Sequence, residues 1–340
     1  MYDVTIVGAT GLVGKEFLSI IESRNFPVKT LKLFASERSE GETLKFKGKD
    51  VPVNKISEKN IRKNPCDFAF FSAGAVVSKQ FAEVFSKEGA TVIDNSSAFR
   101  MEKNIPLVVP EVNGKPFGTE RSPGIIANPN CSTIQMIPVL NATDELFGLK
   151  SLVVSTYQSV SGSGMKGIDE LSDQTSELFK GRDVTPSTFP QRISFNTIPH
   201  IGPFHPNGYT NEENKMIEET RKILSIPKLP VDVTAVRVPV FYGHAEALTV
   251  FTEKDTDIAL FRKHLEKKPP HKIMDDIENL EYPTTADAVG RDSIFVGRIR
   301  HGNGGQNKKS MNMWITADNV RIGAALNAVK IAERFTEKKR

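Results

Sequence analysis

A turn with regularly spaced glycines, Gly8-Ala9-Thr10-Gly11-Leu12-Val13-Gly14, constrains the fold more than any other segment of the chain. The apolar run Val4–Val7 precedes it and reads as a buried strand, and a helical apolar pattern over Leu12–Glu22 follows it. Gly8 permits the tight turn, and Gly14 lets the helix pack closely on the sheet. A strand, turn and helix in this order are typical of a parallel sheet with crossover helices.

The alternation of short strands and helices continues to about residue 130. Apolar runs predict strands at Leu31–Ala35, Phe68–Phe71 and Thr91–Ile93, and the pattern over Phe81–Phe85 predicts a helix between the last two. This order indicates an α/β domain of the Rossmann type with a doubly wound parallel sheet.

Beyond about residue 150 the pattern changes. Longer strands are predicted over Ser151–Gln158, Val231–Val238 and Ala247–Thr252, with helices near Gly164–Phe179 and Glu212–Leu224. These elements indicate an α+β second domain with a more antiparallel sheet.

The last predicted helix covers about residues 320–334, and we expect it to pack back on the first domain. The predicted domains are therefore residues 1–130 with 319–340, and residues 131–318.

Composition places the chain among ordinary globular proteins and favours a small, anionic substrate. Hydrophobic residues make up 39% and charged residues 25%, and the net charge is only +4. This charge gives no case for nucleic acid, and no run approaches the roughly 18 apolar residues of a membrane span. Two cysteines form no disulfide framework, and we expect no leader peptide before the first strand. We expect a cytoplasmic protein without a metal.

The glycine turn also predicts a dinucleotide site. Gly11 lets a pyrophosphate approach the backbone at the helix N-terminus. At the end of the second strand a cofactor without a 2′-phosphate expects Asp or Glu, whereas Ser36 and Arg38 suit a 2′-phosphate. Arg38 as a solvated loop cation is the alternative, and Glu37 is an unfavourable neighbour. The sequence favours NADP over NAD.

The run Asn128-Pro129-Asn130-Cys131-Ser132 lies between a predicted strand at Gly124–Ala127 and a helical pattern. Asn130 is a plausible N-cap, so Cys131 would open the helix. Unpaired N–H groups and the helix dipole would favour the thiolate form of Cys131 there. A small buried cysteine that fills space under a turn is the alternative, and this segment alone does not decide between them.

A nicotinamide cofactor beside an activated cysteine indicates chemistry on an acyl phosphate or an aldehyde, which needs an acid–base group. Among the six histidines, His244 lies between two apolar strand-like runs, where a strand end could bring it into a cleft. A structural histidine is the alternative reading of the same pattern.

Four segments together resemble the bacterial branch of the aspartate-β-semialdehyde dehydrogenase family. They are NPNCS with Cys131, YQSVSGSG with Gln158, RVPVFYGHAEA with Arg237 and His244, and NSSAFR with Arg100. The resemblance extends over essentially the whole chain. It implies NADPH-dependent reductive dephosphorylation of L-4-aspartyl phosphate to L-aspartate 4-semialdehyde through a cysteine thioester. It also implies a role in lysine (diaminopimelate), threonine, methionine and isoleucine biosynthesis, and a homodimer built through the second, catalytic domain.

The resemblance assigns roles to individual residues. Cys131 matches the nucleophile, His244 the acid–base group and Gln158 a residue that orients the acyl group. The residues implied to bind substrate are Arg237 for the α-carboxylate, Glu212 for the α-ammonium, and Arg100 and Lys215 for the phosphate, with Glu213 an open alternative to Glu212. The residues expected to contact the cofactor are Gly8, Thr10, Gly11, Leu12, Val13, Ser36, Arg38, Ser39, Ser161, Gly162 and Asn319.

Two other functions compete with this reading. N-acetyl-γ-glutamyl-phosphate reductase shares the fold, cysteine and cofactor, but its acylated substrate amine disfavours a carboxylate such as Glu212. A non-catalytic NADP-binding redox sensor needs neither Gln158 nor His244. Cys66, the second cysteine, is interpreted as buried and inert.

Overall fold

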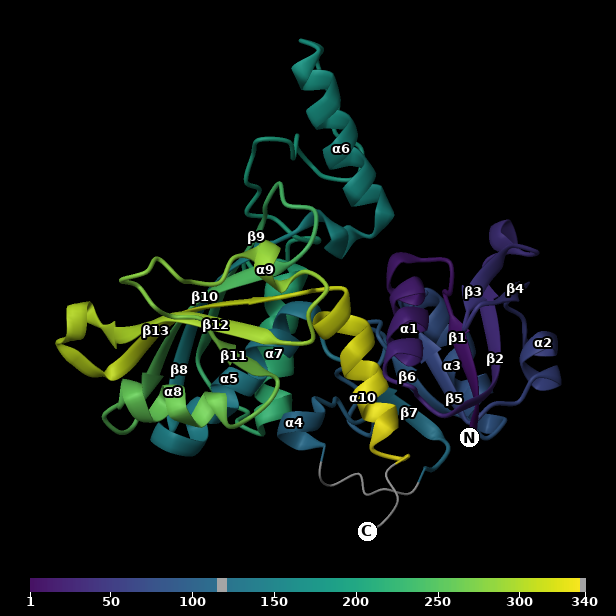
Figure 1. Ribbon diagram of the computed structural model, residues 1–340, viewed down its shortest axis with the longest axis horizontal. Coiled ribbons are helices and arrows are strands. Elements are labelled where there is room, and N and C mark those ends of the chain that lie inside the picture. The colour runs from purple at the N-terminus through teal and green to yellow at the C-terminus, as the bar shows by residue number, and fades with distance from the viewer. Residues whose placement is uncertain (115–120, 337–340) are drawn as a thin grey trace. The chain divides into compact units, whose positions relative to one another are not determined.

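The computed structural model describes residues 1–114 and 121–336 and contains two compact units (Figure 1). Unit 1 consists of Met1–Asn130 and Ala324–Arg340, and unit 2 of Cys131–Gly323. The first division lies at the predicted position. The return to unit 1 lies at Ala324 instead of residue 319, so Asn319 belongs to unit 2.

Unit 1 contains a seven-stranded sheet, counted over its described residues, with the order β3-β4-β2-β1-β5-β6-β7. All neighbouring pairs are parallel except the β3–β4 hairpin, which the sequence reading did not predict. The doubly wound parallel sheet is confirmed. The strands are β1 (Tyr2–Val7), β2 (Val28–Ala35), β3 (Thr43–Phe46), β4 (Lys49–Lys55), β5 (Phe68–Phe71), β6 (Thr91–Asp94) and β7 (Gly124–Ala127).

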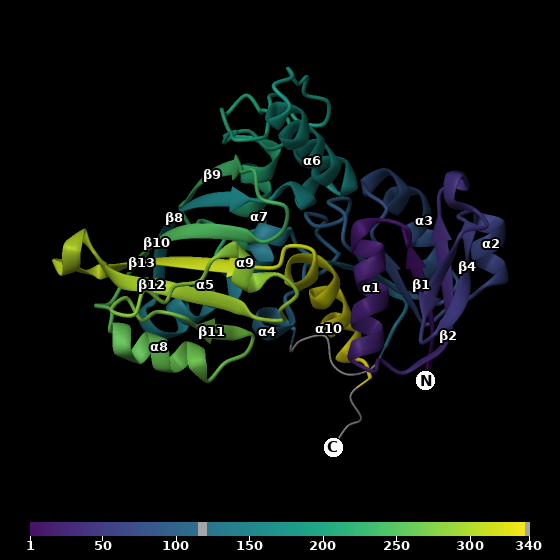
Figure 2. The same cartoon turned by 45° about the horizontal axis from the view of Figure 1, so that its top comes forward.

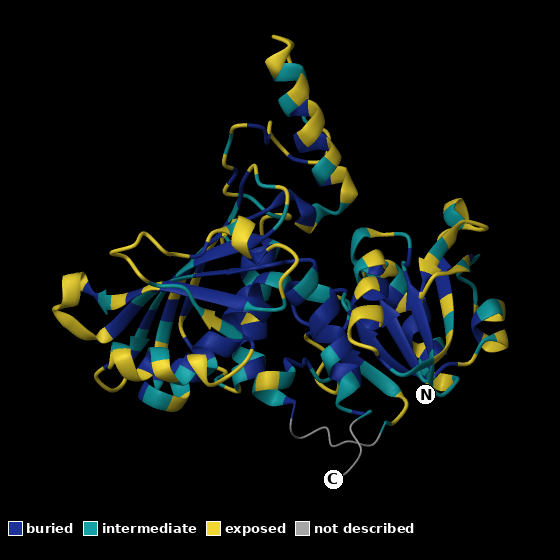
Figure 3. Ribbon diagram, viewed as in Figure 1, coloured by how far each residue is buried: buried dark blue, intermediate teal, exposed yellow. Residues whose placement is uncertain are grey.

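Helices cover both faces of this sheet. Successive side chains of β5 point to opposite faces, so each packs against a different helix. Phe70 packs against Phe17 of α1, with ring centroids 5.0 Å apart, and Phe71 packs against Phe85 of α3 at 5.4 Å. The buried strands between more exposed helices are visible in Figure 3. The helices of unit 1 are α1 (Leu12–Ser23), α2 (Glu58–Lys63), α3 (Ala75–Lys87), α4 (Pro110–Asn113) and α10 (Asn327–Glu333).

Asn327 is one of the residues that hold the returning segment in unit 1. The Asn327 amide donates to the Val108 carbonyl at 2.9 Å and to Oδ1 of Asn128 at 2.6 Å. The predicted continuous helix over 320–334 needs correction, because Arg321–Leu326 is a π-helix (η5) and α10 begins only at Asn327.

Unit 2 contains a six-stranded mixed sheet with the order β11-β12-β13-β10-β8-β9 (Figure 2). The three central pairs are antiparallel, whereas β8–β9 and β11–β12 are parallel. The strands are β8 (Leu149–Gln158), β9 (Val231–Arg237), β10 (His244–Thr252), β11 (His271–Ile273), β12 (Ile294–Gly302) and β13 (Asn307–Ala317).

One face of this sheet is covered by helices. The other is open over β8 and is partly covered at β13, where Trp314 donates to the Pro283 carbonyl. In β8, Leu152 and Val154 are buried, whereas Val153 and Tyr157 are 42% and 38% exposed. Helix α5 contacts β8, β10 and β13 on the buried side. The helices of unit 2 are α5 (Cys131–Phe147), α6 (Met165–Phe179), α7 (Asn211–Leu224), α8 (Ile258–Glu266) and α9 (Thr285–Ala288). None of the described helices is both long and apolar enough to span a membrane.

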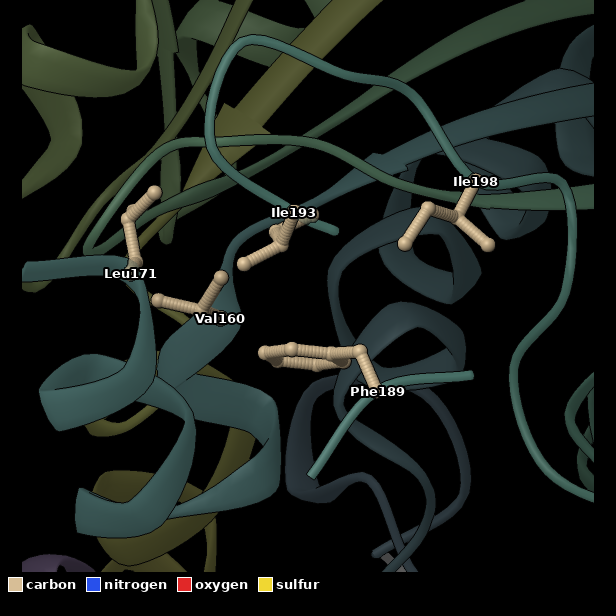
Figure 4. Close-up of a cluster of buried hydrophobic side chains, with 5 residues drawn as sticks. All are labelled: Val160, Leu171, Phe189, Ile193 and Ile198. Carbon is tan, nitrogen blue, oxygen red and sulfur yellow. The ribbon is translucent and has the colours of Figure 1, made fainter. Parts of the chain in front are cut away.

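A small apolar cluster anchors the 3₁₀ turn η3 (Val160–Ser163) that follows β8 (Figure 4). Val160 is fully buried and belongs to the same cluster as Phe189. Burial of one turn residue in a packed cluster fixes the path of its neighbours, which carry polar groups of the site described next. The cluster consists of Val160, Leu171, Phe189, Ile193 and Ile198.

Candidate active site

Three of the predicted site residues lie at one edge of the unit 2 sheet. Gln158 ends β8 and pairs with Arg237, which ends the parallel neighbour β9. His244 begins β10, and Ala245 beside it pairs with Tyr157 across the antiparallel β8–β10 pair. Residues separated by some 80 positions in sequence therefore meet because their strands are neighbours.

Cys131 is the first residue of α5, as the sequence reading expected, and it is partly exposed. A Cβ atom at Gly323 would lie only 2.8 Å from the Cβ of Cys131, so only glycine leaves room for the cysteine there. Burial lowers the pKa of Arg237, and the negative charges of Glu212 and Cys131 oppose this effect. Arg237 thus lies within electrostatic range of both groups.

A chain of hydrogen bonds connects the start of α5 to the start of α7. Nε2 of Gln158 donates to Oγ of Ser132 at 2.8 Å and to Oε1 of Glu212 at 3.4 Å. The Lys215 ammonium in turn forms an ion pair with Oε2 of Glu212 at 3.3 Å. The structure therefore brings Gln158, Glu212 and Lys215 together next to the residue that follows Cys131.

The two adjacent glutamates, Glu212 and Glu213, have different surroundings. The Glu213 carboxylate accepts from the backbone N–H of Thr210 at 2.6 Å and from that of Ala235 at 2.9 Å. It completes a capping box and ties α7 to β9. Glu213 thus has a structural use, whereas Glu212 faces Gln158 and Lys215.

Arg237 is buried, and its guanidinium is held in a fixed orientation. Nη1 donates to the Ser159 carbonyl at 2.6 Å, and Nη2 donates to Oγ of Ser163 at 3.4 Å. The guanidinium also lies 5.8 Å from the ring centroid of Phe189, a member of the apolar cluster. A planar cation oriented in this way is suited to a carboxylate.

His244 is fully buried, and a backbone N–H group defines the hydrogen-bonding role of one of its ring nitrogens. The N–H of Ser159 donates to Nδ1 at 3.1 Å, so Nδ1 is an acceptor and the neutral ring carries its proton on Nε2. Nε2 has no hydrogen-bond partner among the described residues. Burial, followed by the charge of Arg237, lowers the pKa of His244 to about 3.

The loop after β8 packs closely against Arg237 and His244 at Gly162, and polar contacts support it from within. A Cβ at Gly162 would lie 2.9 Å from Nη1 of Arg237 and 3.5 Å from Nε2 of His244. Ser161 and Asn319 are buried and bonded to each other, with the Asn319 amide donating to Oγ of Ser161 at 3.0 Å. These side chains support the loop, which leaves Gly162 as its exposed position.

Asn319 does not cap the segment that follows it. Its Oδ1 accepts from the N–H of Gly243 at 3.0 Å. Asp318 is the capping residue, because its Oδ1 accepts from the backbone N–H groups of Val320 and Arg321 at 2.9 and 3.0 Å.

In unit 1 the glycine turn has the predicted form. Gly8 has φ +83°, and a Cβ there would lie 2.8 Å from the Ser72 backbone. A Cβ at Gly14 would lie 2.2 Å from the carbonyl oxygen of Gly8. Gly11 is exposed at the turn, followed by Leu12 in the first turn of α1. Packing therefore requires two of the glycines, and the third leaves the backbone accessible.

The loop after β2 lies beside this turn. Oγ1 of Thr10 and Oγ of Ser39 are hydrogen-bonded at 3.2 Å. Ser36 and Arg38 are exposed, whereas the unfavourable neighbour Glu37 forms an ion pair with Lys55 at 2.9 Å. Val13 is partly exposed on α1. Because Thr10 and Ser39 are bonded, the turn and the loop after β2 form one local group, which fits a dinucleotide.

Arg100 is buried in unit 1 and held by two backbone carbonyls. Its Nε donates to the carbonyl of Asn128 at 2.9 Å, and its Nη2 donates to that of Asn95 at 2.8 Å. Asn128 begins the run that contains Cys131, so Arg100 is bound to that run through the backbone.

Sequence reasoning missed three supporting residues, Ser132, Ser159 and Gly323. Ser132 and Ser159 directly follow Cys131 and Gln158, which is the signal that was available. Gly323 interrupts an apolar helical pattern, but nothing in the sequence connects it with Cys131. No group of three or more His, Cys, Asp or Glu side chains is arranged to hold a metal ion within the described residues.

A dinucleotide turn in one unit, and in the other a thiol that opens a helix together with a buried arginine and histidine at the ends of neighbouring strands, define a thiol-dependent oxidoreductase. Family models support this class: residues 3–119 match "Semialdehyde dehydrogenase, NAD binding domain", and residues 140–322 match "Semialdehyde dehydrogenase, dimerisation domain". The chain is 50% identical to aspartate-semialdehyde dehydrogenase of Aquifex aeolicus, over 98% of this chain and 97% of the relative. It is 45% identical to that of Campylobacter jejuni, over 99% and 98%.

A solved structure agrees with these relatives. Aspartate semialdehyde dehydrogenase II of Vibrio cholerae, complexed with ASA, has a TM-score of 0.94 at 45% identity, covering 99% of this chain and 98% of that one. The chain belongs to the aspartate-semialdehyde dehydrogenase family, which confirms the resemblance drawn from its motifs.

Proposed function

We propose that this chain catalyses the NADPH-dependent reductive dephosphorylation of L-4-aspartyl phosphate to L-aspartate 4-semialdehyde and phosphate. The observation that carries the proposal is the arrangement of Gln158, Arg237 and His244 at the ends of neighbouring strands, with Gln158 hydrogen-bonded to Ser132, the residue after Cys131. The product is a precursor of lysine, by way of diaminopimelate, and of threonine, methionine and isoleucine.

The proposed reaction begins with the thiolate of Cys131. It attacks the β-carbonyl carbon of the acyl phosphate, a C–S bond forms, and the C–O bond to phosphate breaks. NADPH held at the glycine turn of Gly8, Gly11 and Gly14 would supply the hydride for reduction of the resulting thioester. The tetrahedral product then loses its bond to sulfur, which releases the aldehyde and returns the thiolate.

His244 is proposed to manage the proton of this sequence. As hydride reaches the thioester carbon, negative charge develops on oxygen, and Nε2–H of the neutral ring is the available donor. Donation by the neutral ring leaves an imidazolate, and the hydroxyl proton returns to Nε2 as the C–S bond breaks, so the ring is neutral before and after the sequence. The Ser159 N–H keeps Nδ1 an acceptor in the neutral ring, so the proton occupies the nitrogen that this role requires.

The substrate has three charged groups, and each has a proposed partner. The fixed guanidinium of Arg237 suits the α-carboxylate, and Glu212 suits the α-ammonium. The structural use of Glu213 supports Glu212 for this role. Lys215 and Arg100 are proposed for the phosphate.

The residues beside the glycine turn support NADP rather than NAD. Ser36 and Arg38 are exposed after β2, where an acidic residue would otherwise accept from the ribose, and Glu37 is paired with Lys55. The proposed cofactor contacts in unit 2 are those of Ser161, Gly162 and Asn319, with Gly162 the exposed position among them.

We also propose that the open face of the unit 2 sheet is covered by a second copy of the chain. Val153 and Tyr157 are exposed there, and Tyr157 packs against Trp314 with ring centroids 5.2 Å apart. A groove of about 550 Å³ continues this apolar surface and includes Tyr282. Sedimentation of wild type should give a dimer, and Tyr157→Lys should shift it towards monomer. A monomeric wild type would contradict this proposal.

A steady-state comparison of two aldehydes tests the activity. Phosphate-dependent reduction of NADP⁺ should be at least about 100-fold faster, as kcat/KM, with aspartate semialdehyde than with N-acetylglutamate semialdehyde. The reason is that an acylated amine offers Glu212 no positive charge. The reverse preference would assign the chain to N-acetyl-γ-glutamyl-phosphate reduction, and no turnover of either would favour the redox sensor.

A further inference from the structure

A buried polar cluster lies directly behind the site, and no role has been assigned to it. Glu246 is two residues after His244 on β10, so both side chains point to the same face of the sheet. Gln135 and Ser132 are three residues apart on α5, which packs against β10, and therefore share one face of that helix. Glu246, Gln135 and Ser132 are all fully buried.

The polar atoms of Glu246 and Gln135 are short of partners. Neither carboxyl oxygen of Glu246 and neither amide atom of Gln135 has a well-aligned hydrogen bond among the described residues. Burial raises the pKa of Glu246 well above its usual range, and hydrogen-bonding by Gln135 and then Ser132 opposes this only in part. Burial therefore favours the protonated form of this carboxyl group.

A protonated carboxyl matches these two neighbours chemically. It can donate its O–H to the amide oxygen of Gln135, while its carbonyl oxygen accepts from the amide N–H₂ or from a hydroxyl. A carboxylate could only accept, and it would leave the amide oxygen of Gln135 without a donor. Buried polar groups persist in a fold when they satisfy one another, so Glu246 and Gln135 are explained best as a pair.

Ser132 connects this pair with the reacting groups. Its Oγ accepts from Nε2 of Gln158 at 2.8 Å, and Gln158 also reaches Glu212. Ser132 also lies on the side of α5 that faces Glu246, near enough to influence its carboxyl group, while its oxygen accepts from Gln158. The rotamer of Gln158 beside Cys131 thus depends on a group that cannot itself reach the substrate.

We propose that Glu246 is a positioning residue for acyl transfer, acting through Ser132 to fix the side chain of Gln158 beside Cys131. This role deepens the proposed function and rests on it. It predicts that geometry and hydrogen-bonding capacity at position 246 matter, and that a carboxylate charge does not.

The test compares Glu246→Gln with Glu246→Leu and Glu246→Asp. The Gln variant keeps one donor and one acceptor at the same distance, so kcat with aspartate semialdehyde should stay within about threefold of wild type. The Leu variant removes both, and the Asp variant withdraws them, so each should lower kcat by about tenfold or more with the KM for NADP⁺ unchanged. The Asp variant keeps the proposal testable if the Leu variant does not fold.

Two controls separate positioning from mere stability. Thr316→Val removes another buried, unpartnered polar group of the same sheet, at a register position next to that of Glu246 and therefore on the opposite face. It should leave kcat unchanged. Ser132→Ala should reproduce the loss of Glu246→Leu, and the double variant should lose no more than either alone, because both act through one link.

Acylation of Cys131 by p-nitrophenyl acetate, measured as a burst in each variant, makes the outcome independent of the natural substrate. A slower burst for Glu246→Leu with a normal burst for Glu246→Gln supports the proposal even if aspartate semialdehyde is not turned over, an outcome that would overturn only the proposed function. Unchanged kcat and an unchanged burst in folded Glu246→Leu would overturn the role of Glu246.

Discussion

The glycine turn of unit 1 and the thiol site of unit 2 are built in opposite ways. The turn is a continuous segment, residues 8–14, and its geometry follows from contacts within itself and with two adjacent loops, at Ser39 and at Ser72. The thiol site combines residues from α5, β8, α7, β9 and β10. A local site can be read from spacing, whereas a distributed site depends on which strands become neighbours.

The glycines of the two regions show the same difference. Gly14 has no side chain because a Cβ would collide with the backbone of Gly8, which is a requirement of the fold. Gly162 has none because a Cβ would meet Nη1 of Arg237, the proposed substrate-binding group, and approach Nε2 of His244, the proposed acid–base group. Gly14 is needed for close packing of the helix on the turn, whereas Gly162 leaves room for side chains of the proposed site.

The largest expected effect separates the two cysteines. Cys131→Ser should lower kcat by at least roughly a thousandfold, because the hydroxyl is a far weaker nucleophile than the thiolate at neutral pH. NADPH binding, followed by fluorescence titration, should be unchanged because the glycine turn is intact. Cys66→Ser is the matched control, since burial raises the pKa of the Cys66 thiol to about 12 and Cys66 is far from a reactive state. Substantial turnover by Cys131→Ser would exclude the covalent route.

Replacing the proposed proton carrier should have the next largest effect. His244→Asn should lower kcat by about 100-fold or more, while leaving the affinity for NADPH unchanged, because a general acid–base group is lost and the cofactor turn is not. Rapid-quench kinetics should place the loss in the hydride-transfer step. A His244→Asn enzyme with wild-type kcat would return His244 to a structural role.

A cation in unit 1 should act on the cofactor alone. Arg38→Ala should raise the KM for NADPH by about 10- to 100-fold, which is the loss of one charged hydrogen bond, and leave the KM for NADH within about twofold. Lys55→Ala, which removes only the partner of Glu37, is the comparison variant. Equal effects of Arg38→Ala on the two cofactors would remove Arg38 from the 2′-phosphate site.

The paired glycine variants test the contrast directly. Gly14→Ala should destabilise the protein by about 1–3 kcal/mol through overpacking, seen as a lower midpoint of denaturation. Gly162→Ala should leave that midpoint nearly unchanged and instead raise the KM for aspartate semialdehyde several-fold by displacing Arg237. If Gly162→Ala mainly destabilised the fold, the two glycines would not differ in kind.

The smallest effect concerns stability and pH. The neutral ring of His244 has a pKa of about 3 in the folded state, below the ordinary value of 6.5 for an accessible histidine. The unfolded chain therefore binds the proton first, so this residue lowers stability as pH falls from about 6.5 towards 3, with no effect above that range. Denaturation of wild type and His244→Asn should diverge as the pH is lowered through that window. Parallel curves would mean that His244 is not buried as a neutral ring.

Sequence predicts the first region better than the second, for physical reasons. The spacing of Gly8, Gly11 and Gly14 reports backbone sterics directly, so the turn and its helix were recognised without a relative. The β3–β4 hairpin escaped prediction because its strands are short and only partly buried. The π-helix at Arg321–Leu326 escaped because its apolar pattern is nearly that of an α-helix.

For the site, residue chemistry alone left Cys131 and His244 undecided, and only the family motifs assigned them. The sequence did not reveal the residues that support the site from behind. Ser132, Gly323 and Glu246 become visible only when α5, the final turn and β10 are neighbours in space. Long-range packing carries that information, and no local spacing encodes it.

The central claim is that Cys131 carries the acyl group. Incubating the enzyme with aspartate semialdehyde and NADP⁺ without phosphate should trap the thioester, since oxidation proceeds and no phosphate is present to release the acyl group. Mass spectrometry of the acid-quenched protein should show one added aspartyl group, located in the peptide containing Cys131 and absent from Cys131→Ser. NADPH formation without that adduct, or an adduct on any other residue, would contradict the account.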